Sequence, residues 1–237
     1  MNALHLKHSS YYGATLVVVA SLLMGCGGGT TAVAAPMNNA IHLNTPMTLQ
    51  PLTAAETETL LFVREEEKLA RDVYLTLYQR WGNATFQNIA LRSEQTHMDA
   101  IKVLVDAAGL ADPVVSDGVG VFSNAQIANL YTTLVERGNP SVVEALRVGG
   151  FIEEFDIKDL QEAIAEASQG SNQAAVLQVY NNLMAGSRNH LRAFVTALAN
   201  QGVAYQAQVL TQEQVDTIVN SAWERGHGAG RGKMRGQ

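Results

Sequence analysis

Carboxylates and histidines occur inside the apolar stripes of the segments that the sequence predicts to be long helices. Glu94 and His97 form a Glu-x-x-His segment, and this spacing on a helix aims a carboxylate oxygen and an imidazole nitrogen at one point. Glu67, Glu153 and His190 occupy matching stripe positions in three other segments. Burying several carboxylates together is unfavourable unless a cation neutralises them, so the pattern predicts a shared metal site.

Neighbouring carboxylates leave alternatives to this set. Glu66 borders the same apolar stripe as Glu67 and is its reserve candidate, whereas Glu65 is expected on a solvated face with pairing to residues one turn away. Glu154 is a rival of Glu153, and the phase of the apolar stripe favours Glu153. The sequence therefore predicts one ligand from each pair.

Asp156 has two interpretations. It lies four residues after Ile152 and four before Leu160, where a carboxylate on the apolar stripe is a metal ligand. Alternatively, the helix breaks near Asp156 and this residue caps a new one. His190 alone is also explained as a hydrogen-bonded core histidine, and Tyr74 as a core residue that donates to a site carboxylate.

The elements that must position these residues are predicted to be helices. Apolar residues recur every three or four positions, and the region 51–224 has prolines only at 51, 113 and 140. We expect an all-α fold, a four-helix bundle with a short extra helix between the second and third long helices and a C-terminal helix. The expected ranges are 54–81, 85–108, 124–136 with caps at Ser123 and Asn124, a helix beginning after Pro140-Ser141, 173–200 and 211–223.

Composition and charge exclude several function classes. The chain has 237 residues, a formal net charge of −6 and 47% hydrophobic residues, which favours one substantial core and argues against nucleic acid as a partner. Its single cysteine, Cys26, rules out disulfides, thiolate zinc sites and cysteine nucleophiles in the folded part. Any chemistry must use other side chains.

The N-terminal region has the order of a secretory signal, with a weakly basic start followed by an uncharged apolar run. The run ends in Leu23-Met24-Gly25-Cys26, which resembles the bacterial lipobox. A membrane-spanning anchor is the alternative, but the run is shorter than the ~20 residues that a spanning helix needs. We expect residues 1–25 to be removed and Cys26 to carry a lipid, so that the protein contacts a membrane only through that lipid.

The chain would then be an exported lipoprotein of the cell envelope, on the periplasmic face of a membrane, and of the outer membrane in a Gram-negative source. Residues 26–50 are expected to form a flexible tether, 51–224 the folded domain and 225–237 a disordered Gly/Arg tail.

Two motifs resemble the ferritin-like superfamily, rubrerythrin-type members especially. The segment EKLARDVY at 67–74 looks like the Glu-x-x-Ala-Arg-x-x-Tyr segment of the first rubrerythrin helix, where the glutamate is an iron ligand. Glu94 and His97 look like the ligand pair of the second helix. Residues 52–222 resemble an uncharacterised prokaryotic ferritin-like family, the domain of unknown function 2202, from which no established activity carries over.

The fourth long helix departs from the rubrerythrin pattern. Its expected Glu-x-x-His reads Ser187-Arg188-Asn189-His190, so one carboxylate is absent. Asp156, three residues after Glu153, would restore the number of carboxylates from the neighbouring helix. Without that replacement, a mononuclear or metal-free site is expected.

The resemblance implies two metal ions, iron or manganese, and a chemistry of Fe(II) oxidation by oxygen or peroxide. Oxygen and imidazole donors without thiolate suit both metals. The chain lacks the four cysteines of a rubredoxin-like centre, so electrons must come from a separate donor protein or from Fe(II) itself, and a homodimer is compatible with the sequence. The alternative is a non-catalytic binding module or metal buffer of the envelope. The expected ligands are Glu67, Glu94, His97, Glu153, Asp156 and His190.

Overall fold

The computed structural model describes residues 48–224, and these residues form helices joined by loops, with no strand among them. The predicted all-α class is confirmed. Helix bounds are α1 Ala54–Trp81, α2 Ala84–Ile89, η1 Ala90–Glu94, α3 Gln95–Ala107, α4 Ala125–Gly138, α5 Val142–Ala167, α6 Gln173–Ala199 and α7 Gln212–Asn220.

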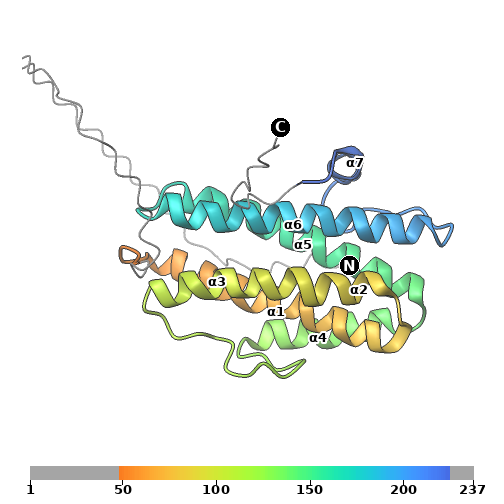
Figure 1. The fold of residues 1–237 in the computed structure, drawn as a ribbon, viewed down its shortest axis with the longest axis horizontal. Helices are drawn as coiled ribbons and strands as arrows, with labels where there is room; N and C mark the ends of the chain where they lie inside the picture. Colours follow the sequence, from red (N-terminus) through yellow and green to blue (C-terminus); the bar gives the residue numbers. More distant parts are fainter. Residues whose placement is uncertain (1–47, 225–237) are drawn as a thin grey trace, which may run out of the picture. The chain divides into compact units, whose positions relative to one another are not determined.

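The long helices lie side by side (Figure 1). α1 packs against α3 and α5, and α6 packs against α5 and α3, so that these helices enclose a common interior. α1 and α6 run in one direction, and α3 and α5 run in the other (Figure 1). A long connection that includes α4 joins α3 to α5, and α4 covers the outer side of α1 and α5.

Local sequence signals set the ends of several helices. Thr53 and Glu56 form a capping box at the start of α1, and Gly82 ends this helix in the left-handed conformation, at φ 65°. Asn124 caps α4 by accepting hydrogen bonds from the backbone of Gln126 and Ile127, and Ser141 caps α5. These caps satisfy backbone donors that the first turn of a helix leaves unpaired.

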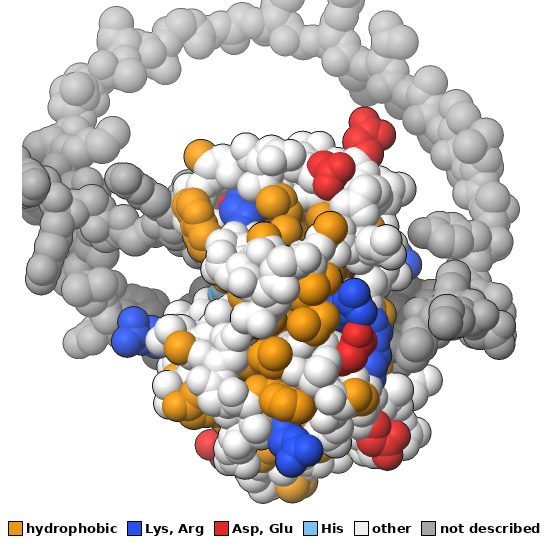
Figure 2. Space-filling model, turned by 90° about the vertical axis from the view of Figure 1, so that its right-hand side faces the viewer, with side chains coloured by type: hydrophobic (Ala, Val, Ile, Leu, Met, Phe, Trp, Pro, Cys, Tyr) orange, Lys and Arg blue, Asp and Glu red, His pale blue; other side chains and the backbone are white. Residues whose placement is uncertain are grey.

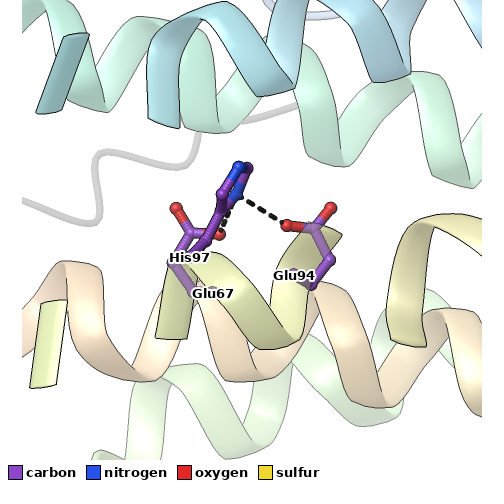
Figure 3. A group of neighbouring side chains, drawn as sticks. All are labelled: Glu67, Glu94 and His97. Atoms are coloured by element: carbon purple, nitrogen blue, oxygen red, sulfur yellow. Dashed lines mark hydrogen bonds and ion pairs between the residues drawn. The ribbon is translucent and has the colours of Figure 1, made fainter. Parts of the chain in front are cut away.

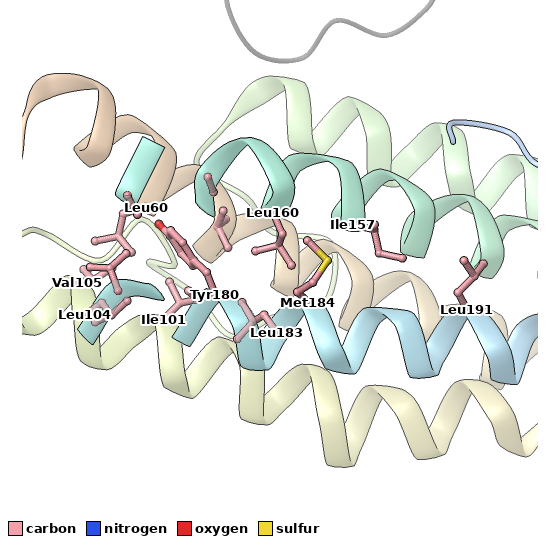
Figure 4. Close-up of a cluster of buried hydrophobic side chains, with 14 of the residues drawn as sticks. Leu60, Ile101, Leu104, Val105, Ile157, Leu160, Tyr180, Leu183, Met184 and Leu191 are labelled. Atoms are coloured by element: carbon pink, nitrogen blue, oxygen red, sulfur yellow. The ribbon is translucent and has the colours of Figure 1, made fainter. Parts of the chain in front are cut away.

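Two apolar layers fill the interior at different heights. One contains Leu60 and Val63 of α1 with residues of α3, α5 and α6 (Figure 4). The other centres on Tyr74, Phe86 and Phe194, whose ring centroids lie 5.1 to 6.0 Å apart. The buried carboxylates and histidines lie between these layers along the helices, so the apolar layers shield a polar one.

The second long helical segment differs from the prediction of one uninterrupted helix. Residues Ala90–Glu94 form a π-helical turn, in which the backbone N–H of Gln95 donates to the carbonyl of Ala90, five residues back. This wider turn rotates α3 relative to α2, so that Ile89 before the turn and His97 after it both face the interior. π turns of this kind are frequent at functional sites.

The third long helix is continuous through Asp156. α5 runs from Val142 to Ala167 without a break, and the Asp156 side chain is buried inside it. The alternatives of a helix break and of a capping role for Asp156 are therefore wrong.

The expectation that Glu65 lies on a solvated face is also wrong. Its side chain is buried, and its carboxylate accepts hydrogen bonds from the backbone N–H groups of Ser123 at 2.5 Å and Asn124 at 2.9 Å. Lys68, one turn further, is buried too and donates to Asp72. The connection between α3 and α4 covers this charged face, and such long-range covering leaves no periodic signal in α1.

Acidic and basic side chains are interspersed on the face shown in Figure 2, with apolar side chains between them. Within residues 48–224, no helix has the length and apolarity needed to cross a bilayer. The expected signal segment 1–25, the lipidated Cys26, most of the tether 26–50 and the tail 225–237 lie outside the described residues, and these expectations stay predictions.

Candidate metal centre

Glu67, Glu94 and His97 form the first of two groups that offer metal ligands, and we call it the His97 position. His97 lies between the two carboxylates (Figure 3). Its Nδ1 is 3.1 Å from Glu67 Oε2 and 3.0 Å from Glu94 Oε2, and all three side chains are buried. The predicted Glu-x-x-His pair thus converges with a carboxylate from α1.

Glu94, Glu153 and His190 form the second group, which we call the His190 position. His190 Nδ1 lies 3.0 Å from Glu94 Oε1 and 3.3 Å from Glu153 Oε2. The Tyr74 hydroxyl donates a hydrogen bond to Glu153, which is the role predicted for this tyrosine from the sequence. The rings of His97 and His190 stack with centroids 5.5 Å apart.

Glu94 belongs to both groups and offers one oxygen to each. A carboxylate with this placement can bridge two cations. Two buried oxygens of the cluster, Glu67 Oε1 and Asp156 Oδ1, make no hydrogen bond within residues 48–224. Buried polar atoms are costly without partners, and divalent cations at the two positions would supply them. The donor set, carboxylate oxygen and imidazole nitrogen, fits iron or manganese.

The pKa values of these groups show how the cluster balances charge through protons. Burial raises the pKa of Glu67 and of Glu153 to about 7, although the neighbouring histidines oppose this shift. Burial opposes a charge on His190, but the carboxylates of Glu94 and Glu153 outweigh it and raise the pKa to about 10. For Glu94, the effect of His190 and His97 exceeds that of burial, and its pKa is lowered. The raised pKa values of Glu67, Glu153 and His190 mean that these ligands retain protons, and bound cations would replace these protons.

Asp156 is next to the centre but belongs to neither group. The Ser187 hydroxyl is hydrogen-bonded to Asp156 Oδ2 and lies 2.9 Å from the carbonyl of Leu183. Burial and then the charge of Glu67 raise the pKa of Asp156 well above its usual range. Ser187 stands where the resemblance predicts a glutamate, and Asp156 is the carboxylate predicted to compensate for that loss. The two side chains are hydrogen-bonded to each other.

The two rival carboxylates are also buried, and Glu66 belongs to neither group. Glu154 faces away from the centre and accepts hydrogen bonds from the backbone N–H groups of Gln208, Val209 and Leu210. The Tyr205 hydroxyl donates to it as well, at 2.5 Å. The structure thus brings Glu153, and not Glu154, to the candidate centre.

Glu154 and Glu153 make a matched pair for mutation. The substitution Glu154→Gln is expected to reduce the free energy of unfolding by about 3 kcal/mol, because backbone donors of the segment before α7 lose a charged acceptor. Metal content should stay unchanged. The substitution Glu153→Gln should instead lower metal content. Urea unfolding and elemental analysis of both variants check this, and metal loss in Glu154→Gln would contradict the assignment.

Two residues at the centre had no signal in the sequence. Ser93 lies in the π turn, with its hydroxyl 2.6 Å from His190 Nε2. Gly186 lies against His97, and a Cβ there would be 2.4 Å from His97 Nε2. Ser93 and Gly186 are small residues next to the predicted ligands His190 and His97. Their contacts depend on how α6 packs on the π turn, which the sequence pattern does not indicate.

Comparisons with known proteins identify one family and one uncharacterised relative. Residues 56–222 match the model of an uncharacterised protein domain, DUF2202. The uncharacterised protein MJ0754 of Methanocaldococcus jannaschii is 50% identical over 177 residues, which cover 75% of this chain and 93% of that protein. The crystal structure of the hypothetical protein MJ0754 matches with a TM-score of 0.70 and 48% identity, and the match covers 76% of this chain and all of that one. The chain belongs to the DUF2202 domain family.

Proposed function

We propose that this protein is a ferritin-like four-helix bundle that binds two iron or manganese ions and oxidises Fe(II) with oxygen or peroxide. The cell envelope, reached through Cys26, is the location that we propose with it. One observation carries the proposal: two buried groups, each of two carboxylates and one histidine, share Glu94. Helices that project Glu and Glu-x-x-His ligands inward are the arrangement found in ferritin-like carboxylate proteins.

Bound iron would supply the one-electron redox step. The protein's own part is to hold the ligands and to exclude water. Glu94 would supply one oxygen to each position, and Tyr74 fixes the orientation of Glu153 through its hydroxyl. The aromatic layer of Tyr74, Phe86 and Phe194 shields one side of the centre from solvent. Glu67 and Glu153, each with a pKa of about 7, are suited to release protons as cations bind.

A metal buffer without turnover is the second candidate function. The observation that favours it is the pairing of Asp156 with Ser187. This contact occupies an oxygen of the carboxylate that would otherwise complete the ligand set, and each position then has three protein ligands. Such a site would bind and release cations without a redox cycle.

Metal analysis and oxidation assays separate these functions. After anaerobic loading with Fe(II) and removal of excess, the first function predicts about two iron ions per chain and rapid Fe(II) oxidation on addition of oxygen or peroxide. Two bound ions without oxidation would support the buffer instead. Less than one ion per chain would contradict both. The exposed substitution Glu58→Gln on α1 is the surface control and should retain full loading.

A further inference from the structure

We propose that the two positions are unequal, with the His190 position binding its cation first and tightly and the His97 position holding an exchangeable cation. This inference rests on the proposed metal site and concerns the order in which it fills. It comes from the residues behind the ligands, which differ between the two positions.

The ligands of the His190 position are held from outside. His190 Nε2 is hydrogen-bonded to Ser93 Oγ at 2.6 Å, so the opposite ring nitrogen, Nδ1, faces the carboxylates. The hydroxyl of Tyr74 holds Glu153, and this tyrosine is itself fixed between Phe86 and Phe194, with ring centroids 6.0 and 5.1 Å away.

The ligands of the His97 position lack such support within residues 48–224. Glu67 Oε1 is buried without a hydrogen bond, and the contacts of the His97 ring with Glu67 and Glu94 both go through Nδ1. The opposite nitrogen, Nε2, faces Gly186, which has no side chain to hold it. The nearby carboxylate of Asp156 is engaged by Ser187. The His190 ring is therefore held by hydrogen-bond partners at both of its nitrogens, whereas the His97 ring is held through Nδ1 and by packing against Gly186.

Outer partners of this kind change metal affinity in a known direction. A hydrogen bond to the second nitrogen of an imidazole fixes its tautomer and orientation, and its loss costs roughly 10- to 100-fold in affinity. A site with ligands held in place loses less conformational entropy on binding. Only the His190 position has these partners on both of its unshared ligands.

Titration of the full metal-free chain with Co²⁺ tests the order of filling. Calorimetry and the visible absorption of bound Co²⁺ should resolve two steps whose dissociation constants differ by at least about tenfold. The substitution Ser93→Ala should weaken the tight step by roughly 10- to 100-fold and leave the weak step nearly unchanged. The substitution Ser93→Thr, which keeps the hydroxyl, should restore the tight step. Thr96→Ala, which removes an exposed hydroxyl three residues further along the chain in α3, is the matched control.

The substitution Gly186→Ala tests the other position. The new Cβ would lie 2.4 Å from His97 Nε2 but 3.8 Å from His190 Cε1, so it displaces only the first ring. The weak step should be lost and the tight step retained. Alanine is the better helix former, so a loss of affinity reports on the ring contact and not on helix stability.

The outcomes separate this inference from the proposed function. Binding of two Co²⁺ ions with equal affinity, or an equal effect of Ser93→Ala on both steps, would overturn the unequal positions and leave the metal site standing. Loss of the tight step in Gly186→Ala with retention of the weak one would reverse the order and overturn it as well. Failure to bind any cation would overturn both proposals.

Discussion

The substitution Glu94→Gln is expected to abolish binding at both positions, which no other single ligand substitution should do. Glu94 is the one residue that the two groups share, with Oε2 3.0 Å from His97 Nδ1 and Oε1 3.0 Å from His190 Nδ1. Glutamine keeps the shape but removes the negative charge and one acceptor. We expect at least a 100-fold loss of affinity, that is, more than roughly 2.7 kcal/mol, at each position.

The same substitution should destabilise the metal-free protein. The pKa of Glu94 is lowered by its two histidines, so the carboxylate is charged and compensates them in the interior. Breaking a buried ion pair by removing one partner costs about 3–5 kcal/mol. Thermal unfolding in the presence of a chelator measures this effect.

Matched variants make the result decisive. Glu67→Gln and Glu153→Gln each remove a ligand of one position only, so each should retain about one ion per chain. Glu58→Gln removes an exposed carboxylate of α1 and should behave as the unchanged protein. If Glu94→Gln keeps one tightly bound ion, Glu94 does not bridge, and the two groups are separate sites.

Helical periodicity was sufficient to predict most of the framework. The ranges 54–81 and 173–200 agree with α1 and α6 to within one residue, because long amphipathic helices with clear caps carry their signal locally. The positions of Glu67, Glu94 and Glu153 in the apolar stripes also predict that these side chains face the interior. They lie there together with His97 and His190, because inward-facing residues at the same height of neighbouring helices contact one another.

The features that the sequence could not predict depend on contacts between distant segments. Glu65 is buried because the backbone of Ser123 and Asn124 docks on it, and its neighbours in α1 cannot indicate this. The π turn adds one residue to a helix that periodicity predicts to be regular, and Ser93 contacts His190 only as a result. From the sequence, Asp156 is explained equally well as a helix cap and as a metal ligand. The capping role is excluded only by the structure, in which α5 continues through Asp156.

Stability without metal should fall as the pH rises from about 5 to 8. The pKa of Glu67 and of Glu153 is about 7 in the folded protein, against 4.5 ordinarily, so both prefer the proton in the folded state. That preference stabilises the fold at low pH and is lost as the pH rises through 7. His190, with a pKa of about 10 against 6.5, acts in the same direction above pH 6.5. The lowered pKa of Glu94 matters only below pH 4.5.

Each pKa unit corresponds to about 1.4 kcal/mol, so two carboxylates raised from 4.5 to about 7 contribute about 7 kcal/mol. At roughly 2–4 °C per kcal/mol for a domain of this size, Tm of the metal-free protein should decrease by roughly 15–30 °C. Bound metal should reverse the trend, because cations bind the deprotonated ligands and replace the protons that the rising pH removes. The Tm gained on adding Mn²⁺ should therefore be larger at pH 8 than at pH 5. Thermal scans with and without chelator measure both curves.

The double variant Glu67→Gln, Glu153→Gln tests whether these two carboxylates cause the slope. Glutamine cannot titrate, so Tm of the metal-free variant should fall much less steeply between pH 5 and 6.5. His190 does not yet contribute in this range, and the raised pKa of Asp156 accounts for the slope that remains. The variant should also be more stable than the unchanged protein at pH 8, because it no longer buries two carboxylates that carry charge there. A metal-free Tm that rises with pH in the unchanged protein would show that the cluster is solvated or differently arranged. The tested property is the one on which the proposed metal site depends, namely buried ligands that hold protons until cations replace them.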